Sequence, residues 1–204
     1  MPMMRRDFIF GVAAFGVIGA VAWRHGNWFG LAAGPGPVDS PPTPTAPDGK
    51  PVMVTIVKFS DAGERLEVVS VPKVVKSDAE WRKLLTPNQY DIARKADTEM
   101  AFSGEGYNRH DKGIYRCVCC GNALYSSDTK YDSGTGWPSF WAPIAKENIV
   151  ERSDNSYMME RTEVSCRLCD AHLGHVFDDG PKPTGLRYCM NAAAMKFIAA
   201  GKTS

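Results

Sequence analysis

The chain has 204 residues, which is enough for one sizeable domain with appendages. Hydrophobic residues make up 44% and charged residues 23% of it, an ordinary balance that excludes wholesale disorder. The net charge of +1 lacks the basic excess of nucleic-acid-binding proteins, so we expect no nucleic-acid partner. Without residues 1–22 the basic and acidic counts fall from 24 and 23 to 22 each, which favours a small or neutral substrate.

The first residues have the pattern of a targeting segment. Arg5 and Arg6 precede an apolar run over 8–23 that contains no charged residue, and 20–22 has the small-x-small form of a cleavage site. The pattern resembles a twin-arginine export signal. An uncleaved N-terminal anchor within 1–31 is the alternative, although the run is short of the about 20 residues that span a bilayer. Both interpretations predict a periplasmic or cell-envelope protein, with membrane contact only through such an anchor.

The composition changes twice before the predicted domain begins. Residues 32–51 contain seven prolines in twenty positions, which predicts an extended, semi-rigid linker. We place the domain at 52–204. Its first part has two β-branched runs, 52–59 and 65–75, which a glycine-containing segment separates, and this pattern predicts a β-hairpin.

Two short helices should follow the hairpin. Ser77 and Glu80 match a capping box at the start of the first helix. Thr86 and Gln89 match a second capping box, with a proline at the first helical position, and this helix should run to about Lys95. Beyond it the helical periodicity fades, and short apolar runs alternate with glycine-rich turns. We therefore expect a mainly β fold with short N-terminal helices.

Five of the six cysteines lie in two clusters. Cys117 and Cys120 form one C-x-x-C pair, and Cys166 and Cys169 form the other. Four thiolates from two such turns give the tetrahedral shell that structural zinc prefers, so we expect one Zn²⁺ per chain. The alternative is a pair of disulfides, which an oxidising compartment favours. Cys119 remains outside this set, because a tetrahedral site already has four ligands.

Cys189 has no cysteine near it in the sequence. A thiol becomes nucleophilic where cationic groups or hydrogen-bond donors lower its pKa, and several suitable residues precede it: His172, His175, Asp179 and Arg187. The two histidines are suited either to acid–base chemistry or to a structural role. Cys189 itself is suited either to catalysis or to an inert place in the core. The residues alone leave these alternatives open.

Three stretches resemble one known family. "KYDSGTGWPSFW", "CRLCDAHLGHVFDDGP" and "TGLRYCMNAAAMKF" are similar to the signature blocks of the B-type methionine sulfoxide reductases, which act on the R epimer. The stretch "EWRKLLTPNQYDIARKADTEMAFSGEGYNRHDKGIYRCVCCGNALY" is similar to the amino-terminal half of that family. The resemblance covers about 77–198.

The resemblance implies a fold, a set of site residues and a cofactor. The implied fold has two antiparallel sheets preceded by short helices, and the implied metal is zinc on the four paired cysteines. The residues of "NAAAMKFIAA" taken alone predict a helix. The family pattern instead indicates a strand in the first half of that stretch. Trp137 would form the pocket for the substrate methyl group. The residues implied to act around the catalytic thiol are Cys189, Arg187, Asn191, His172, His175 and Asp179.

The implied chemistry fits these side chains. A low-pKa Cys189 thiolate attacks the sulfoxide sulfur while an acid such as His175 protonates the oxygen. Arg187 would favour the thiolate, and Asn191 would orient the leaving oxygen or a water. The products are methionine and a sulfenic acid on Cys189, which a thiol must reduce. Oxidised proteins or peptides are therefore the expected substrates of a monomeric repair enzyme of the cell envelope. A zinc module that only binds a protein, or another thiol enzyme such as a peroxidase, is the alternative.

The reduction of the Cys189 sulfenic acid should differ from that in many members of the family that this sequence resembles. They carry a resolving cysteine where this chain has Thr135, whose hydroxyl cannot form a disulfide. Cys119 is the one thiol left over, and it would have to come within disulfide reach of Cys189. We therefore expect direct reduction of the sulfenic acid by a thioredoxin-like protein or another external thiol.

Overall fold

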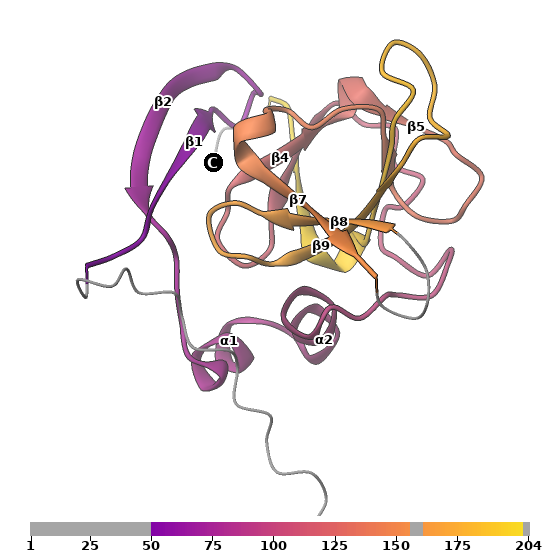
Figure 1. Cartoon of the computed structure of the whole chain (residues 1–204). Helices are drawn as coiled ribbons and strands as arrows, with labels where there is room; N and C mark the ends of the chain where they lie inside the picture. The colour runs from indigo at the N-terminus through magenta and orange to yellow at the C-terminus, as the bar shows by residue number, and fades with distance from the viewer. Residues whose placement is uncertain (1–49, 156–160, 202–204) are drawn as a thin grey trace, which may run out of the picture. The chain divides into compact units, whose positions relative to one another are not determined.

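The computed structural model describes residues 50–155 and 161–201. The predicted export signal and nearly all of the proline-rich linker lie outside the described residues. Within these ranges, no helix is both long and apolar enough to cross a membrane. The described strands form a two-stranded, a six-stranded and a three-stranded sheet (Figure 1).

The helices and strands are, in chain order, β1 (Met53–Phe59), β2 (Arg65–Pro72), α1 (Asp78–Leu84), α2 (Pro87–Lys95), β3 (Gly113–Cys117), β4 (Ala123–Ser126), β5 (Lys130–Tyr131), β6 (Ser139–Phe140), β7 (Ile149–Asp154), β8 (Arg161–Cys166), β9 (His172–Phe177), β10 (Arg187–Met190) and β11 (Met195–Ala199). Short 3-10 helices lie between them at η1 (Ser127–Thr129), η2 (Lys146–Asn148) and η4 (Ala192–Ala194).

The predicted N-terminal hairpin is confirmed. β1 and β2 pair antiparallel, and Gly63 turns the chain between them, where its backbone N–H donates to the Ser60 carbonyl at 3.1 Å. In Figure 1 the hairpin is the indigo pair of strands at the left of the view. Shortly after the hairpin ends, Val74 N–H donates to the Leu168 carbonyl at 2.8 Å.

One buried asparagine joins the hairpin to the rest of the domain. Asn148 has no exposed surface. Its side-chain oxygen accepts from Val57 N–H at 2.7 Å, and its amide nitrogen donates to the Val57 carbonyl at 2.9 Å. The same nitrogen donates to the Ala123 carbonyl of β4 at 2.8 Å. The side-chain amide thus takes the place that a neighbouring backbone strand would have beside β1.

Both helices begin as the capping residues predict. Ser77 and Glu80 form a reciprocal capping box before α1, and Thr86 and Gln89 form another before α2. α2 ends at Lys95, as expected. It packs against β9 and η4, and the helices lie below the strands in Figure 1. These local motifs set the helix boundaries because they satisfy the amide groups of the first turn.

The two larger sheets enclose an aromatic core. The six-stranded sheet has the order β5-β6-β10-β9-β8-β7, the three-stranded sheet has the order β11-β3-β4, and the neighbours in both pair antiparallel. Phe140 of β6 stacks on Tyr125 of β4 at 4.4 Å and meets Tyr115 of β3 edge-on at 5.0 Å. The prediction of a mainly β domain with two antiparallel sheets is therefore confirmed.

The prediction for "NAAAMKFIAA" is wrong in both forms. The stretch is not a helix, and its strand is not in the first half, because Ala192–Ala194 form the 3-10 helix η4 and the strand β11 begins at Met195. β11 pairs with β3, with Met195 opposite Cys117 and Phe197 opposite Tyr115. Pairing with a buried strand outweighs the helical preference of the three alanines.

Candidate active site and metal centre

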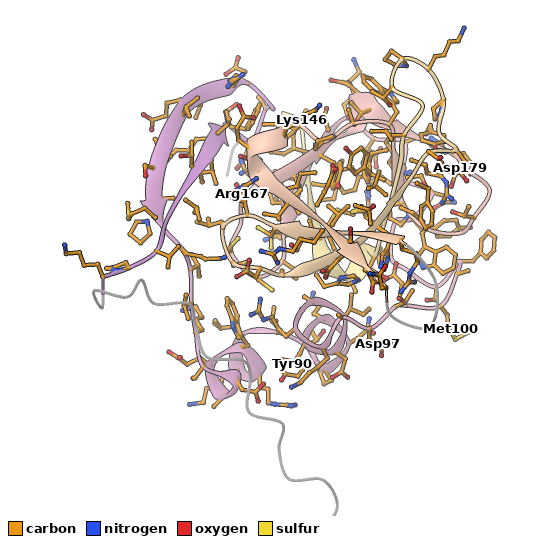
Figure 2. All side chains as sticks on the ribbon, in the orientation of Figure 1. Tyr90, Asp97, Met100, Lys146, Arg167 and Asp179 are labelled. Atoms are coloured by element: carbon orange, nitrogen blue, oxygen red, sulfur yellow. The ribbon has the colours of Figure 1, made fainter. Side chains whose placement is uncertain are left out.

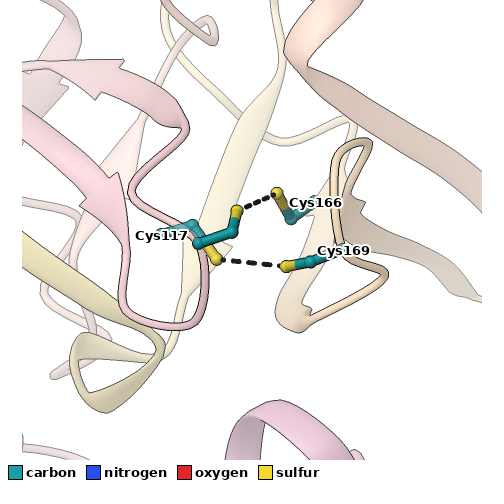
Figure 3. A group of neighbouring side chains, drawn as sticks. Cys117, Cys166 and Cys169 are labelled. Carbon is teal, nitrogen blue, oxygen red and sulfur yellow. Dashed lines mark hydrogen bonds between the residues drawn. The ribbon is translucent and has the colours of Figure 1, made fainter. Parts of the chain in front are cut away.

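The four paired cysteines converge on one point (Figure 3). Cys117 Sγ lies 3.6 Å from Cys169 Sγ, Cys120 Sγ lies 3.6 Å from Cys166 Sγ, and all four sulfurs lie within 4.8 Å of one another. Sulfurs bound to one tetrahedral zinc at about 2.3 Å are about 3.8 Å apart, whereas a disulfide needs about 2.05 Å. The described cysteines form no disulfide. The four sulfurs fit one tetrahedral metal ion.

Each C-x-x-C turn closes with a left-handed residue. Gly121 has φ 76° and donates its N–H to the Cys117 carbonyl at 2.9 Å. Asp170 has φ 55° and donates in the same way to the Cys166 carbonyl at 2.9 Å. Because both turns curl in this manner, the two sulfurs of each pair point the same way. Cys119 packs against the hydrophobic core from the first turn.

Cys189 lies in a row of residues that crosses the six-stranded sheet. On β10 it is directly opposite Ser139 of β6 on one side and His175 of β9 on the other. The row continues to Glu163 of β8, which is opposite His175. Residues that are directly opposite in a sheet share one face, with Cβ atoms about 4.5–5.5 Å apart. The thiol, the imidazole and the carboxylate are therefore neighbours on one face of the sheet.

Hydroxyl groups and an arginine surround the Cys189 thiol. Thr135 Oγ1 lies 3.9 Å from Cys189 Sγ. Burial raises the pKa of the Cys189 thiol, and this effect outweighs the opposing hydrogen bond from Thr135 and the charge of Arg187. Arg187 favours the thiolate, as expected, but the prediction of a low pKa is wrong for the substrate-free chain. A pKa raised by burial favours the protonated thiol at pH 7.

Arg187 is held in place by Asp179. Its Nε and one terminal nitrogen each donate to an Asp179 carboxylate oxygen at 2.8 Å, and its guanidinium lies 4.4 Å from the centre of the Phe177 ring. This pairing lowers the pKa of Asp179. The Asp179 side chain is 58% exposed, and the residue lies at the right of Figure 2. Asp179 therefore pairs with the arginine whose charge opposes the rise in the Cys189 pKa.

The two histidines each have a carboxylate partner. His175 Nε2 lies 2.9 Å from Asp154 Oδ2, and His172 Nδ1 lies 2.7 Å from Glu163 Oε1. The rings meet edge-on with centroids 5.4 Å apart. Burial lowers the pKa of His175, although Asp154 opposes this effect, so the ring is neutral at pH 7. The buried Nε2 of His172 has no hydrogen-bond partner among the described residues.

A bulge and one glycine bring both imidazoles to the same face. Residues three apart on a regular strand point to opposite faces. The register between β8 and β9 shifts after Val164, so that His172 is opposite Ser165 and returns to the face of His175. Gly174, between the histidines, has φ 151°, and a Cβ there would overlap the Cys189 carbonyl. The glycine of "HLGH" is therefore required both by its backbone angle and by the close approach of β10.

Trp137 and Asn191 meet at Glu99, a residue that the sequence analysis missed. The Trp137 indole donates to the Glu99 carbonyl at 3.1 Å, and Glu99 N–H donates to Asn191 Oδ1 at 3.1 Å. The Glu99 carboxylate accepts from the N–H groups of Ala192 and Ala193 at 2.6 and 3.0 Å. Asn191 is buried, and its side chain also donates to the Leu173 carbonyl at 3.3 Å. These contacts indicate that Asn191 and Glu99 position the loop that carries Trp137.

Comparison with known proteins places this site in a family. A model of the SelR domain matches residues 85–199. Peptide methionine sulfoxide reductase MsrB of Hahella chejuensis is 59% identical over 128 residues, which cover 63% of this chain and 92% of that protein. The chain belongs to the B-type methionine sulfoxide reductase family. The MsrB protein of Leptospira interrogans is 57% identical over 125 residues, or 61% of this chain and 95% of that protein. Peptide methionine sulfoxide reductase B1, chloroplastic, of Arabidopsis thaliana is 56% identical over 128 residues, or 62% of this chain and 63% of that protein.

Within this B-type methionine sulfoxide reductase, the predicted residues form two groups. The four paired cysteines, which could hold a metal ion, join the end of β3 to the turn between β8 and β9. The other predicted residues lie on and beside β9 and β10, where Asp179 pairs with Arg187 and Asn191 accepts a hydrogen bond from Glu99. Sequence reasoning missed Glu163 and Asp154, whose only signal is cross-strand register. It also missed Tyr131, which is opposite Ser139 and so extends the row that contains Cys189. The buried hydroxyl of Tyr131 has no hydrogen-bond partner among the described residues.

Proposed function

We propose that this chain reduces the R epimer of methionine sulfoxide in peptides and proteins to methionine, with Cys189 as the attacking group. The observation that carries the proposal is the cross-strand pairing of Cys189 with His175, in a member of a family whose relatives are named peptide methionine sulfoxide reductases. A thiol and an imidazole in adjacent strands are what proton-coupled attack on a sulfoxide requires.

The resting protonation states suggest how the proton moves. Cys189 holds its proton, and His175 is neutral with Nε2 engaged by Asp154, which leaves Nδ1 for proton transfer. His175 takes the thiol proton as the sulfur attacks, and then delivers it to the sulfoxide oxygen. The oxygen passes to Cys189, so the thiol becomes a sulfenic acid while the sulfoxide becomes methionine. Trp137 offers an apolar face for the methyl group, and sulfur–aromatic contact contributes about 0.3–1.5 kcal/mol.

An external thiol completes the cycle in this proposal. Thr135 Oγ1 lies 3.9 Å from the reactive sulfur and has no redox chemistry, which supports direct reduction. One thiol condenses with the sulfenic acid to a mixed disulfide and water, and a second thiol releases Cys189 and leaves as a disulfide. A thioredoxin-like protein fits this role. Mass spectrometry after one equivalent of substrate without reductant should trap a Cys189 sulfenic acid, whereas a Cys119–Cys189 disulfide would contradict it.

Zinc is the metal that the donor set supports best. Four sulfur ligands at tetrahedral spacing leave no open coordination position, so the ion would be structural. Cys117, Cys120, Cys166 and Cys169 would hold it, and it would stabilise the turns between β3 and β4 and between β8 and β9. No step of the reaction needs the ion.

Export to the cell envelope remains part of the proposal and is supported by the sequence alone. The Arg5-Arg6 pair, the apolar run and the proline-rich linker fit a domain delivered folded and then held at a distance from its signal or anchor. There the chain, as a monomer, would repair oxidised envelope proteins. Changing Arg5 and Arg6 to lysine should keep the chain in the cytoplasmic fraction, whereas unchanged localisation would contradict the twin-arginine route.

A stereospecific assay tests the proposed reaction. Methionine release should be measured from the separated R and S sulfoxides of a peptide, with dithiothreitol as the reductant. We expect turnover of the R epimer only, and no turnover by Cys189→Ser with its fold and metal content retained. Equal rates on both epimers, or full activity of Cys189→Ser, would refute the proposal.

A further inference from the structure

One large aromatic side chain beside the site is left in solvent. Phe102 lies in the loop between α2 and β3, and it is 60% exposed. Its neighbour in the same loop, Met100, is 79% exposed and lies on the same side of the view as Asp179 in Figure 2. Exposed apolar side chains are common one at a time, but two in a single loop next to a reactive thiol need a reason.

The backbone holds Phe102 in an unfavourable conformation. Its φ is 65°, in the left-handed region that bulky side chains rarely adopt. Such a conformation persists only where surrounding contacts impose it, and it is concentrated at functional sites. Here the Phe102 N–H donates to the Gly136 carbonyl at 2.8 Å, and its ring meets the Tyr107 ring edge-on at 5.6 Å. The ring is therefore fixed in direction while much of its surface stays open.

The fixed ring packs on the segment that carries Thr135 and Trp137. A Cβ added to Gly136 would approach the Phe102 ring to 2.8 Å, so the ring packs on the backbone of Gly136. Gly136 stands between Thr135, which contacts Cys189 Sγ, and Trp137. The Trp137 indole in turn binds the Glu99 carbonyl, three residues before Phe102. Phe102 and Trp137 thus border the same site from neighbouring segments that are hydrogen-bonded to each other.

We propose that Phe102 is a specificity-determining residue that contacts an apolar side chain flanking methionine sulfoxide in a polypeptide substrate. This inference rests on the proposed function. The occupant is an apolar part of the substrate chain, because the exposed Phe102 ring is apolar and packs on Gly136, the residue between Thr135 and Trp137. A free amino acid has no flanking side chain to make this contact, so Phe102 would favour peptides.

Three substrates test the contact: free R-methionine sulfoxide, a pentapeptide with R-methionine sulfoxide between leucines, and the same peptide with glycines in their place. We expect the unaltered chain to have a kcat/KM about tenfold higher for the leucine peptide than for the glycine peptide. Tenfold corresponds to about 1.4 kcal/mol, as expected from burial of about 60 Å² of apolar surface. Phe102→Ala should remove this preference, mainly through KM, and Phe102→Leu should restore part of it.

Leu84→Ala is the matched control, because Leu84 is also 60% exposed but ends helix α1. It should keep the tenfold preference. A preference that survives Phe102→Ala, an unaltered chain without any preference, or an equal loss on both peptides would overturn the inference. If the unaltered chain reduces neither the peptides nor the free sulfoxide, the proposed function itself fails, and the two failures are thereby distinguished.

Discussion

Replacing Asn148 by alanine tests whether the β1–β2 hairpin is an integral part of the domain. The hairpin precedes the residues that match the SelR domain, 85–199, and Asn148 is its buried link to that domain. The substitution removes three hydrogen bonds, two to Val57 and one to the Ala123 carbonyl. It leaves three backbone groups without their partners at a position that has no exposed surface.

The expected loss follows from these three groups. An unmade hydrogen bond to a buried backbone group costs about 1–3 kcal/mol, and carbonyl groups tolerate the loss better than N–H groups. We therefore expect Asn148→Ala to lower the free energy of unfolding by about 3–5 kcal/mol. Urea denaturation with tryptophan fluorescence, at a fixed zinc concentration, measures this quantity. The backbone amide of Val57 should also lose hydrogen-exchange protection.

The control variant is Asn88→Ala, because Asn88 is exposed on α2. It should change the free energy of unfolding by no more than about 0.5 kcal/mol. A loss below about 1 kcal/mol in Asn148→Ala, with Val57 still protected, would show that the hairpin is held by other contacts and refute the reasoning.

Three further substitutions test the metal centre and the thiol. Cys169→Ser should lower zinc from about one ion per chain and lower the melting temperature, because metal-binding energy is part of the folding energy; metal analysis showing full occupancy with an unchanged melting temperature would contradict the site. Arg187→Leu should raise the pKa of Cys189 further, since the cation favours the thiolate, so iodoacetamide should alkylate Cys189 more slowly at pH 8. The control is Arg109→Leu, at an arginine paired with Asp111. An unchanged rate of Cys189 alkylation in Arg187→Leu would refute the assignment of Arg187. Thr135→Cys places a sulfur where Thr135 Oγ1 lies 3.9 Å from Cys189 Sγ, so substrate without reductant should yield a disulfide in this variant, and mass spectrometry that finds only the sulfenic acid would count against this geometry.

The parts of the fold that short-range motifs specify could be predicted from the sequence. The two capping boxes fixed the starts of α1 and α2, because the donor and acceptor groups lie three residues apart. The C-x-x-C spacing likewise predicted which four sulfurs meet. The 191–200 stretch failed because its conformation depends on β3, about 80 residues away in sequence, rather than on its own alanines.

The same distinction holds for the site. Cys189 and the histidines carried recognisable sequence patterns, whereas Glu99 carried none, since its partners Asn191, Ala192 and Ala193 lie 92 to 94 residues away. The raised pKa of Cys189 was missed for a different reason. Nearby cations are visible in a sequence, but the extent of burial that opposes them depends on how the strands pack.

The row of Ser139, Cys189, His175 and Glu163 determines where the chain can change its length during evolution. Each of these residues comes from a different strand, and a shift of one residue in any strand turns its side chain to the opposite face. Single-residue insertions within β9 or β10 should therefore abolish activity even where the sheet still forms. Insertions in the exposed loop between them, near Pro183, leave the pairing intact and offer sites for new segments or reporter tags.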